Sequence, residues 1–183
     1  MNQLAPLPLA IPVLETPRLR LRGYRPTDFV PYLAMWQEQP FYRFLTPGPP
    51  SEEDVWTILL RSTGHWALQG FGFWAIEEKA TGEFIGAVGF ADGKRLIEPS
   101  IKGVPEIGWV LAAHTHGRGF ATEAVTAALA WADTHFGPVR TVCIMHPDNR
   151  ASRRVAEKFG YREYHRTSYK GQPTVMLERT AGT

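Results

Sequence analysis

The glycine-rich turn at residues 117–119, Gly-Arg-Gly, stands between two apolar segments and has the composition of an anion-binding loop. Residues 106–111 before it are β-branched and aromatic, which predicts a strand. Residues 121–136 repeat apolar side chains every three or four positions, which predicts a helix. The first N–H groups of a helix lack partners inside it, and glycines let an anion approach them. The turn therefore suits phosphate oxygens, although a plain strand-to-helix connection fits the same residues.

Two common phosphate-binding loops are excluded by the residues that follow the turn. A Walker loop places Gly-Lys-Ser/Thr after its glycines, whereas this chain reads Gly119-Phe120-Ala121. The dinucleotide-binding fingerprint needs a third glycine or alanine where this chain has Thr122, and it needs an early strand-helix-strand unit. Neither type of site is predicted here.

Other reactive residue types are sparse. His114 and His116 form an H-x-H pair, but no carboxylate or cysteine cluster accompanies them, so no metal site is predicted. The single cysteine, Cys143, excludes an internal disulfide, and it lies in an apolar run that favours an inert core thiol.

Composition indicates one ordinary globular domain. The 183 residues carry 20 basic and 18 acidic side chains, a balance that argues against a nucleic-acid partner. No run approaches the roughly 20 apolar residues of a membrane span. Residues 1–14 are apolar but lack basic residues and are broken by Pro6, Pro8 and Pro12, which favours an extended tail over a signal peptide. We expect this tail, a single domain over residues 15–183, and a cytoplasmic location.

Hydrophobic spacing along the chain predicts the order of its strands and helices. Strands are expected at residues 18–22, 71–77, 83–90, 106–111, 139–145, 161–168 and 174–179. Helices are expected after Thr27 or Asp28, after Ser51 with Asp54 completing its cap, and at residues 121–136 and 149–159. This order predicts an α/β fold of mixed α+β type, a mixed sheet flanked by helices.

Three segments carry a resemblance to a known family. The turn, His116-Gly117-Arg118-Gly119-Phe120-Ala121, resembles the acetyl-CoA loop Gln/Arg-x-x-Gly-x-Gly/Ala of the GNAT N-acetyltransferase superfamily, with histidine at its first position. The phrases E-T-P-R-L-R-L-R and N-x-x-S-x-x-V-x-E-K-x-G-Y look like the branch that contains the ribosomal-protein N-terminal (Rim-type) acetyltransferases. The resemblance covers about residues 15–179. It implies a twisted, mostly antiparallel mixed sheet of about seven strands with about four helices.

The resemblance implies transfer of an acetyl group from acetyl-CoA to a primary amine in a ternary complex, without a metal. It implies that residues 109–111 offer a strand edge to the pantetheine arm and that the turn holds the pyrophosphate. The implied cofactor-binding residues are Trp109, Val110, Leu111, His116, Gly117, Arg118, Gly119, Phe120, Ala121, Thr122, Asn149 and Ser152.

Catalytic roles follow from the same resemblance. Glu106 is the candidate base, because an amine attacks a thioester only when neutral and a carboxylate in reach takes its proton. A backbone N–H near Val110 is expected to stabilise the oxyanion. Some relatives use a tyrosine to protonate the CoA thiolate, but here that position is Ala156, so Ser152 is the candidate acid.

Two functions remain open at this stage. The leading one is an N-acetyltransferase that acts on a peptide N-terminus or a small-molecule amine. The alternative is a catalytically silent acyl-CoA-binding regulatory module, which the missing tyrosine favours. Exposed aromatic residues near the first helices permit a homodimer.

Overall fold

The structure is a computed structural model that describes residues 10–180. Residues 1–9 of the predicted tail and residues 181–183 lie outside the described part. Within the described part, Ile11 and Leu14 pack against the main core, and Trp74 Nε1 donates a hydrogen bond to the carbonyl of Pro12 at 2.8 Å. The start of the described chain therefore lies against the sheet.

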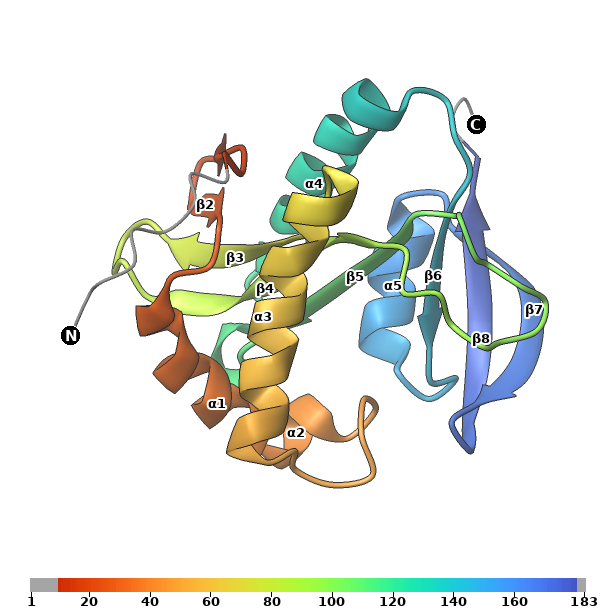
Figure 1. Cartoon of the computed structure of the whole chain (residues 1–183), viewed down its shortest axis with the longest axis horizontal. Helices are drawn as coiled ribbons and strands as arrows, with labels where there is room; N and C mark the ends of the chain where they lie inside the picture. The colour runs from red at the N-terminus through yellow and green to blue at the C-terminus, as the bar shows by residue number, and fades with distance from the viewer. Residues whose placement is uncertain (1–9, 181–183) are drawn as a thin grey trace.

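The described residues form one eight-stranded sheet in the order β1-β2-β3-β4-β5-β6-β8-β7 (Figure 1). All neighbouring strands are antiparallel except β5 and β6, which are parallel. This confirms the predicted mixed, mostly antiparallel sheet, and a short first strand is added at its edge. The strands are β1 (Leu14–Glu15), β2 (Leu19–Arg22), β3 (Phe73–Glu78), β4 (Phe84–Ala91), β5 (Glu106–Leu111), β6 (Thr141–Met145), β7 (Arg162–Tyr169) and β8 (Gln172–Arg179).

Helices begin and end where the local residues dictate. The Ser51 side chain accepts from the Asp54 N–H, Asp54 accepts from the Ser51 N–H, and the helix ends at Gly70 with φ 74°. A short helix, α2, occupies part of the aromatic segment between the two expected N-terminal helices. The α-helices are α1 (Phe29–Gln37), α2 (Gln39–Tyr42), α3 (Glu52–Gln69), α4 (Phe120–Phe136) and α5 (Arg150–Lys158), with 3-10 turns at Pro26–Asp28 and Ala113–Thr115.

Neighbouring strand residues place the helices on opposite faces of the sheet. Trp74 and Ile76 pack in one cluster with α4 and α5, whereas Ala75 between them packs in another cluster with α1 and α2. On this second face, the loop of residues 92–105 covers β6 and β8, because Ile97 and Ile101 are buried against Val142 and Met176. On this face, the start of β5 therefore lies between the part of the sheet on which α1 and α2 pack and the part on which the loop of residues 92–105 packs.

Strands β5 and β6 are paired at only one position and then diverge (Figure 1). Glu106 lies opposite Val142, and the Val142 N–H donates to the Pro105 carbonyl at 3.1 Å. On its other side β5 pairs with β4 along its whole length. One edge of β5 is thus open beyond its first residues, as the resemblance implied.

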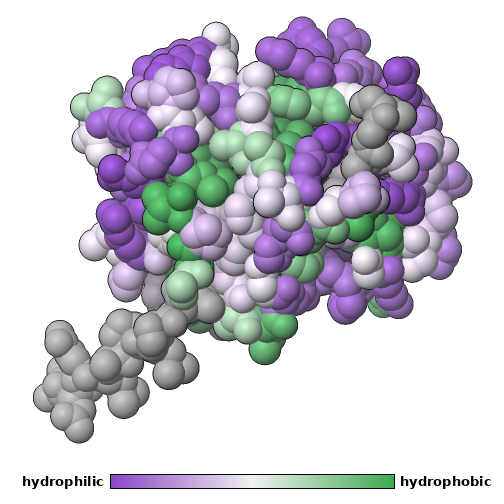
Figure 2. Space-filling model, turned by 90° about the horizontal axis from the view of Figure 1, so that it is seen from above, coloured by the Kyte–Doolittle hydropathy of each residue, from purple (hydrophilic) through white to green (hydrophobic). Residues whose placement is uncertain are grey.

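The surface is mixed in character. The face seen from above in Figure 2 carries apolar residues in separate patches among hydrophilic ones. No helix among residues 10–180 is long and apolar enough to cross a membrane. The homodimer and the cytoplasmic location stay predictions.

Candidate functional site

The glycine turn ends in a helix start that faces outward. Gly117 and Gly119 have φ of 76° and 81°, a conformation that side-chain-bearing residues rarely adopt. The first N–H bonded within α4 belongs to Glu123, which donates to the Gly119 carbonyl at 3.1 Å. The N–H groups at positions 120–122 precede this ladder. They are the groups at which the sequence predicts an anion site.

Arg18 fixes the turn from the side. Its Nη1 donates to the Arg118 carbonyl at 2.8 Å, and its Nε donates to Glu123 at 2.7 Å. The Thr16 hydroxyl donates to the same carboxylate at 2.6 Å. Burial alone would raise the pKa of Glu123, but these hydrogen bonds lower it. The helix start is therefore held in position before any ligand arrives.

A cavity of about 680 Å³ lies in front of this helix start. All the predicted cofactor-binding residues line it except Arg118. The remaining lining residues are Phe41, Arg43, Phe44, Leu45, Thr115, Ala151, Arg154, Val155 and Lys158. The cavity thus joins the glycine turn, the end of β5 and the first turns of α5.

Arg118 lies on the other side of the turn. Its Nη2 donates to Glu78 at 2.7 Å, and its guanidinium carbon lies 4.5 Å from the centre of the Phe120 ring. Its contribution to ligand binding stays a prediction.

Other cations at the cavity were missed from the sequence. Arg154 and Lys158 are four residues apart on α5 and line the cavity with Ala151 and Val155. Neither cation forms an ion pair within residues 10–180. Their spacing of four residues places both on one helical face and could have indicated this role. The other arginines of the segment obscured that pattern. Arg43 adds a third cation from the segment after α2.

The open edge of β5 presents alternate backbone groups to the cavity. The Pro105 carbonyl points towards β6, whereas the Val110 carbonyl points towards Gly86 of β4. Because these directions alternate along a strand, the N–H groups of Trp109 and Leu111 face the open edge. The expected oxyanion donor near Val110 is therefore one of these two groups, since the Val110 N–H faces β4.

Glu106 lies at the closed end of the divergence. Both of its carboxylate oxygens accept from Arg95, with Nε–Oε2 at 2.5 Å and Nη2–Oε1 at 2.9 Å. Glu106 precedes Trp109 by three residues, or about 10 Å along a strand, and does not line the cavity. Burial alone would lower the pKa of Arg95, but the pair with Glu106 raises it. Sequence reasoning did not single out Arg95.

Asn149 and Ser152 both line the cavity at the start of α5. The Asn149 Oδ1 accepts from the Ser152 N–H at 3.1 Å, so this side chain caps the helix. Ala156, at the position of the absent tyrosine, is completely buried in the main core. A larger side chain at this position would have to displace core neighbours.

An aromatic contact closes one side of the site. The Phe44 and His146 rings are stacked with centroids 5.4 Å apart. His146 follows β6, and its Nδ1 accepts from the Asp148 N–H at 3.1 Å. The segment after α2 thereby contacts the end of the diverging strand.

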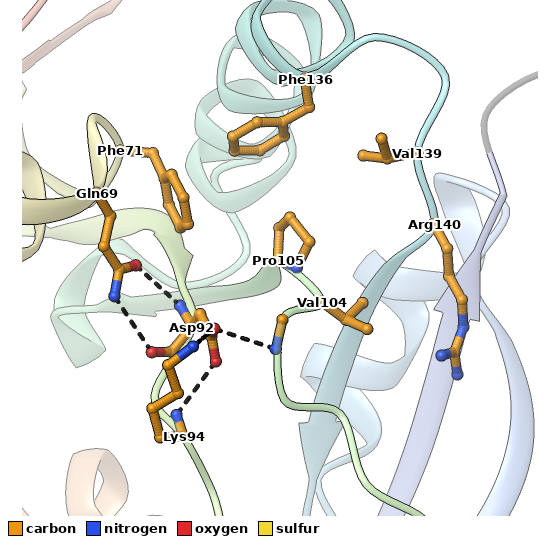
Figure 3. Close-up of a pocket in the computed structure, with 10 residues that line it drawn as sticks. Gln69, Phe71, Asp92, Lys94, Val104, Pro105, Phe136, Val139 and Arg140 are labelled. Carbon is orange, nitrogen blue, oxygen red and sulfur yellow. Dashed lines mark hydrogen bonds and ion pairs between the residues drawn. The ribbon is translucent and has the colours of Figure 1, made fainter.

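A second cavity of about 570 Å³ lies at the other end of β5 (Figure 3). Its walls are apolar, with Phe71, Phe136 and Val139 among them. Its polar groups other than Arg140 pair with one another. Asp92 accepts from Lys94 and from the Gly103 N–H at 3.0 Å, and Gln69 bonds the Asp92 backbone. These contacts hold the base of the loop that carries Arg95.

Among the described residues, no group of three or more His, Cys, Asp or Glu could hold a metal ion. Cys143 is buried, and burial raises the pKa of its thiol, as expected for an inert core residue.

Comparisons with known proteins agree with this geometry. The chain is 37% identical over 173 residues to the uncharacterized protein YkkB of Bacillus subtilis, covering 91% of this chain and 94% of that one. A structure from Bordetella pertussis, described as a GnaT-family acetyltransferase, is 31% identical with a TM-score of 0.80, covering 92% and 99%. RimL, a ribosomal L7/L12 acetyltransferase solved with coenzyme A, shares the fold at 18% identity, with a TM-score of 0.71 and coverage of 92% and 98%.

The family model described as the acetyltransferase (GNAT) domain matches residues 18–162. With these matches, the resemblance suggested by the glycine turn is confirmed, and the chain belongs to the GNAT acetyltransferase family.

Proposed function

We propose that this acetyltransferase moves an acetyl group from acetyl-CoA to a primary amine by direct attack in a ternary complex. The observation that carries the proposal is the cavity that joins the helix start of α4 to the open edge of β5. Acetyl-CoA supplies the thioester whose carbonyl carbon the amine attacks.

The residues present fit the cosubstrate. The N–H groups at positions 120–122 suit its pyrophosphate, and Arg43, Arg154 and Lys158 offer charge for the remaining phosphate. The backbone of Trp109 and the N–H of Leu111 can add strand-like hydrogen bonds to an extended amide-containing arm, whereas the Leu111 carbonyl is bonded to the His116 ring at 3.1 Å. Asn149 and Ser152 complete the opposite wall.

The chain then has a group to take the amine proton, a group to stabilise the oxyanion and a group to stabilise the thiolate. Glu106 takes the proton of the amine, directly or through water, as the C–N bond forms. The N–H of Trp109 or Leu111 stabilises the charge on the carbonyl oxygen. As the C–S bond breaks, the Ser152 hydroxyl donates a hydrogen bond to the thiolate. Both oxygens of Glu106 already accept from Arg95, so the amine competes with this ion pair for the carboxylate.

That occupied carboxylate favours a second candidate function, a silent acyl-CoA-binding module. The buried Ala156 in place of a tyrosine points the same way. The two candidates share cofactor binding and differ in turnover.

The test is to incubate the purified protein with acetyl-CoA and a panel of amines, and to detect acetylated products by mass spectrometry. The panel should hold peptides with free N-termini, amino acids, polyamines and aminoglycosides. RimL acts on a ribosomal protein, so N-terminal peptides of ribosomal proteins belong in it. Amine-dependent release of CoA is expected. Tight binding of acetyl-CoA with no product from any amine would favour the silent module.

A further inference from the structure

Arg95 and Glu106 place a cation and an anion side by side at the closed end of the β5–β6 divergence. Their side chains are 32% and 12% exposed, so the pair is partly open to solvent. The Arg95 guanidinium carbon also lies 5.1 Å from the centre of the Tyr169 ring on β7. This ring supports the guanidinium independently of Glu106.

The loop that carries Arg95 is anchored on both sides of it. Asp92 binds the Gly103 N–H and closes the base of the loop, as Figure 3 shows. Ile97 and Ile101 are 4% and 3% exposed and pack on Val142 and Met176. Burial alone would raise the pKa of Asp92, but bonds from Lys94 and Gly103 lower it and keep this anchor charged. Arg95 is thus presented at a fixed place beside the candidate base.

This arrangement complements a zwitterion. In an α-amino acid the amine nitrogen and the carboxylate carbon are about 2.5 Å apart, because both are bonded to the same carbon. A base for the amine and a cation for the carboxylate must therefore be neighbours. Guanidinium groups bind carboxylates through two parallel N–H bonds, the geometry that Arg95 already adopts with Glu106.

An amino acid can insert into the pair without leaving a charge unpaired. Its carboxylate would take the Arg95 N–H groups and its ammonium would take Glu106. A peptide N-terminus offers only the ammonium, so it would bring a second positive charge beside Arg95. The pair therefore distinguishes free amino acids from blocked ones.

We propose that Arg95 binds the carboxylate of a free α-amino acid acceptor and that this exchange of partners frees Glu106 to take the proton of the acceptor's amine. The inference rests on the proposed acetyl transfer and names its acceptor class.

The experiment compares L-amino acids with their matching amides as acceptors at saturating acetyl-CoA, by release of the CoA thiol. For at least one amino acid, kcat/KM is expected to exceed that of its amide about tenfold or more. Arg95→Gln should bring this ratio close to one, mainly through KM. Arg95→Lys keeps the charge and loses the paired N–H geometry, so it should retain part of the preference.

Arg140→Gln is the matched control. Arg140 pairs with Glu178 at 2.7 Å and lies 5.0 Å from the Tyr164 ring, so it repeats the contacts of Arg95 with a different carboxylate and a different tyrosine. In Arg140→Gln, the ratio of kcat/KM for an amino acid to kcat/KM for its amide should equal that of the unchanged protein. Thermal unfolding with and without acetyl-CoA confirms that each variant is folded.

Three results would overturn the proposal: amides or tripeptides that react as well as amino acids, a preference that survives in Arg95→Gln, or bound acetyl-CoA with no amino acid acetylated. Failure of the unchanged protein to bind acetyl-CoA would instead refute the proposed function itself.

Discussion

Two arginine-carboxylate-tyrosine groups on one half of the sheet use the same contacts in different places. Arg140 and Glu178, beside Tyr164, are 36% and 37% exposed, and they lie just before β6 and on β8. Arg95 and Glu106 lie where β5 and β6 part, and Glu106 is the less exposed carboxylate. Exposed ion pairs contribute little to stability, so the first group is a surface contact. The role of an ion pair therefore depends on its position in the sheet as well as on its residue types.

A third group of paired charges is buried from solvent, and we call it the sealed cluster. Arg22, Asp28 and Glu77 are 5%, 3% and 6% exposed. Arg22 donates to Asp28 at 2.7 and 2.9 Å and to Glu77 at 2.7 Å. A buried guanidinium that is held by two buried carboxylates exchanges partners less readily than the partly exposed Arg95. We therefore assign this cluster to stability.

The largest effect is expected at the sealed cluster. Arg22→Gln leaves two buried carboxylates without their main cation, which should lower the free energy of unfolding by about 3–5 kcal/mol. Denaturant unfolding measures this change. Arg140→Gln should cost less than about 1 kcal/mol. Equal losses in the two variants would contradict the distinction between a sealed and an exposed pair.

The next effect concerns turnover. Glu106→Gln should lower kcat by about 10²–10³-fold, because the amine loses its base, while acetyl-CoA binding is unchanged. Glu178→Gln removes the matched carboxylate and should leave kcat as it was. Steady-state kinetics and a binding titration on each variant make the comparison. If Glu106→Gln kept full turnover, Glu106 would not be the base.

A smaller effect is expected from pH. Burial alone would raise the pKa of Glu77, but hydrogen bonds and charge from Arg22 lower it below the usual 4.5. Its contribution to stability is therefore complete above pH 4.5 and is lost as the pH falls through the lowered pKa. Each unit of lowering corresponds to about 1.4 kcal/mol. Chemical unfolding between pH 3 and 7 should show this decline, and Arg22→Gln should weaken it. An equal decline in both would show that other carboxylates are responsible.

The sequence identified most of the residues that line the larger cavity's glycine-turn side, because they are close together in the chain. The helix start, the glycines and the end of β5 lie within residues 109–122, and local spacing reveals a strand, a turn and a helix. The order of strands and helices along the chain followed from the same periodicities. Strand β1 was not predicted, because a strand of two residues is too short to show an alternation of apolar and polar side chains.

The part of the site that we propose for the acceptor was only partly predictable. Glu106 was found from its place on a strand, but its partner Arg95 comes from a loop with no periodic pattern. That loop is positioned by contacts with distant strands, such as those of Ile97 and Ile101. Similarly, the direction of Arg118 depends on Glu78, forty residues away in sequence. Long-range side-chain pairs of this kind leave no signal in local spacing.

The central claim is that the helix start beside β5 holds acetyl-CoA, and thermal stability during acetyl-CoA titration tests it most directly. At 100 times the dissociation constant, bound ligand should add about 2.7 kcal/mol to the free energy of unfolding. Gly119→Ala should weaken binding about tenfold, because a side chain strains the turn at φ 81°. Gly64→Ala, in α3 with open space at its Cβ, should bind normally and be about 0.5–1 kcal/mol more stable. No stabilisation at saturating acetyl-CoA, or an equal response from both glycine variants, would contradict the account.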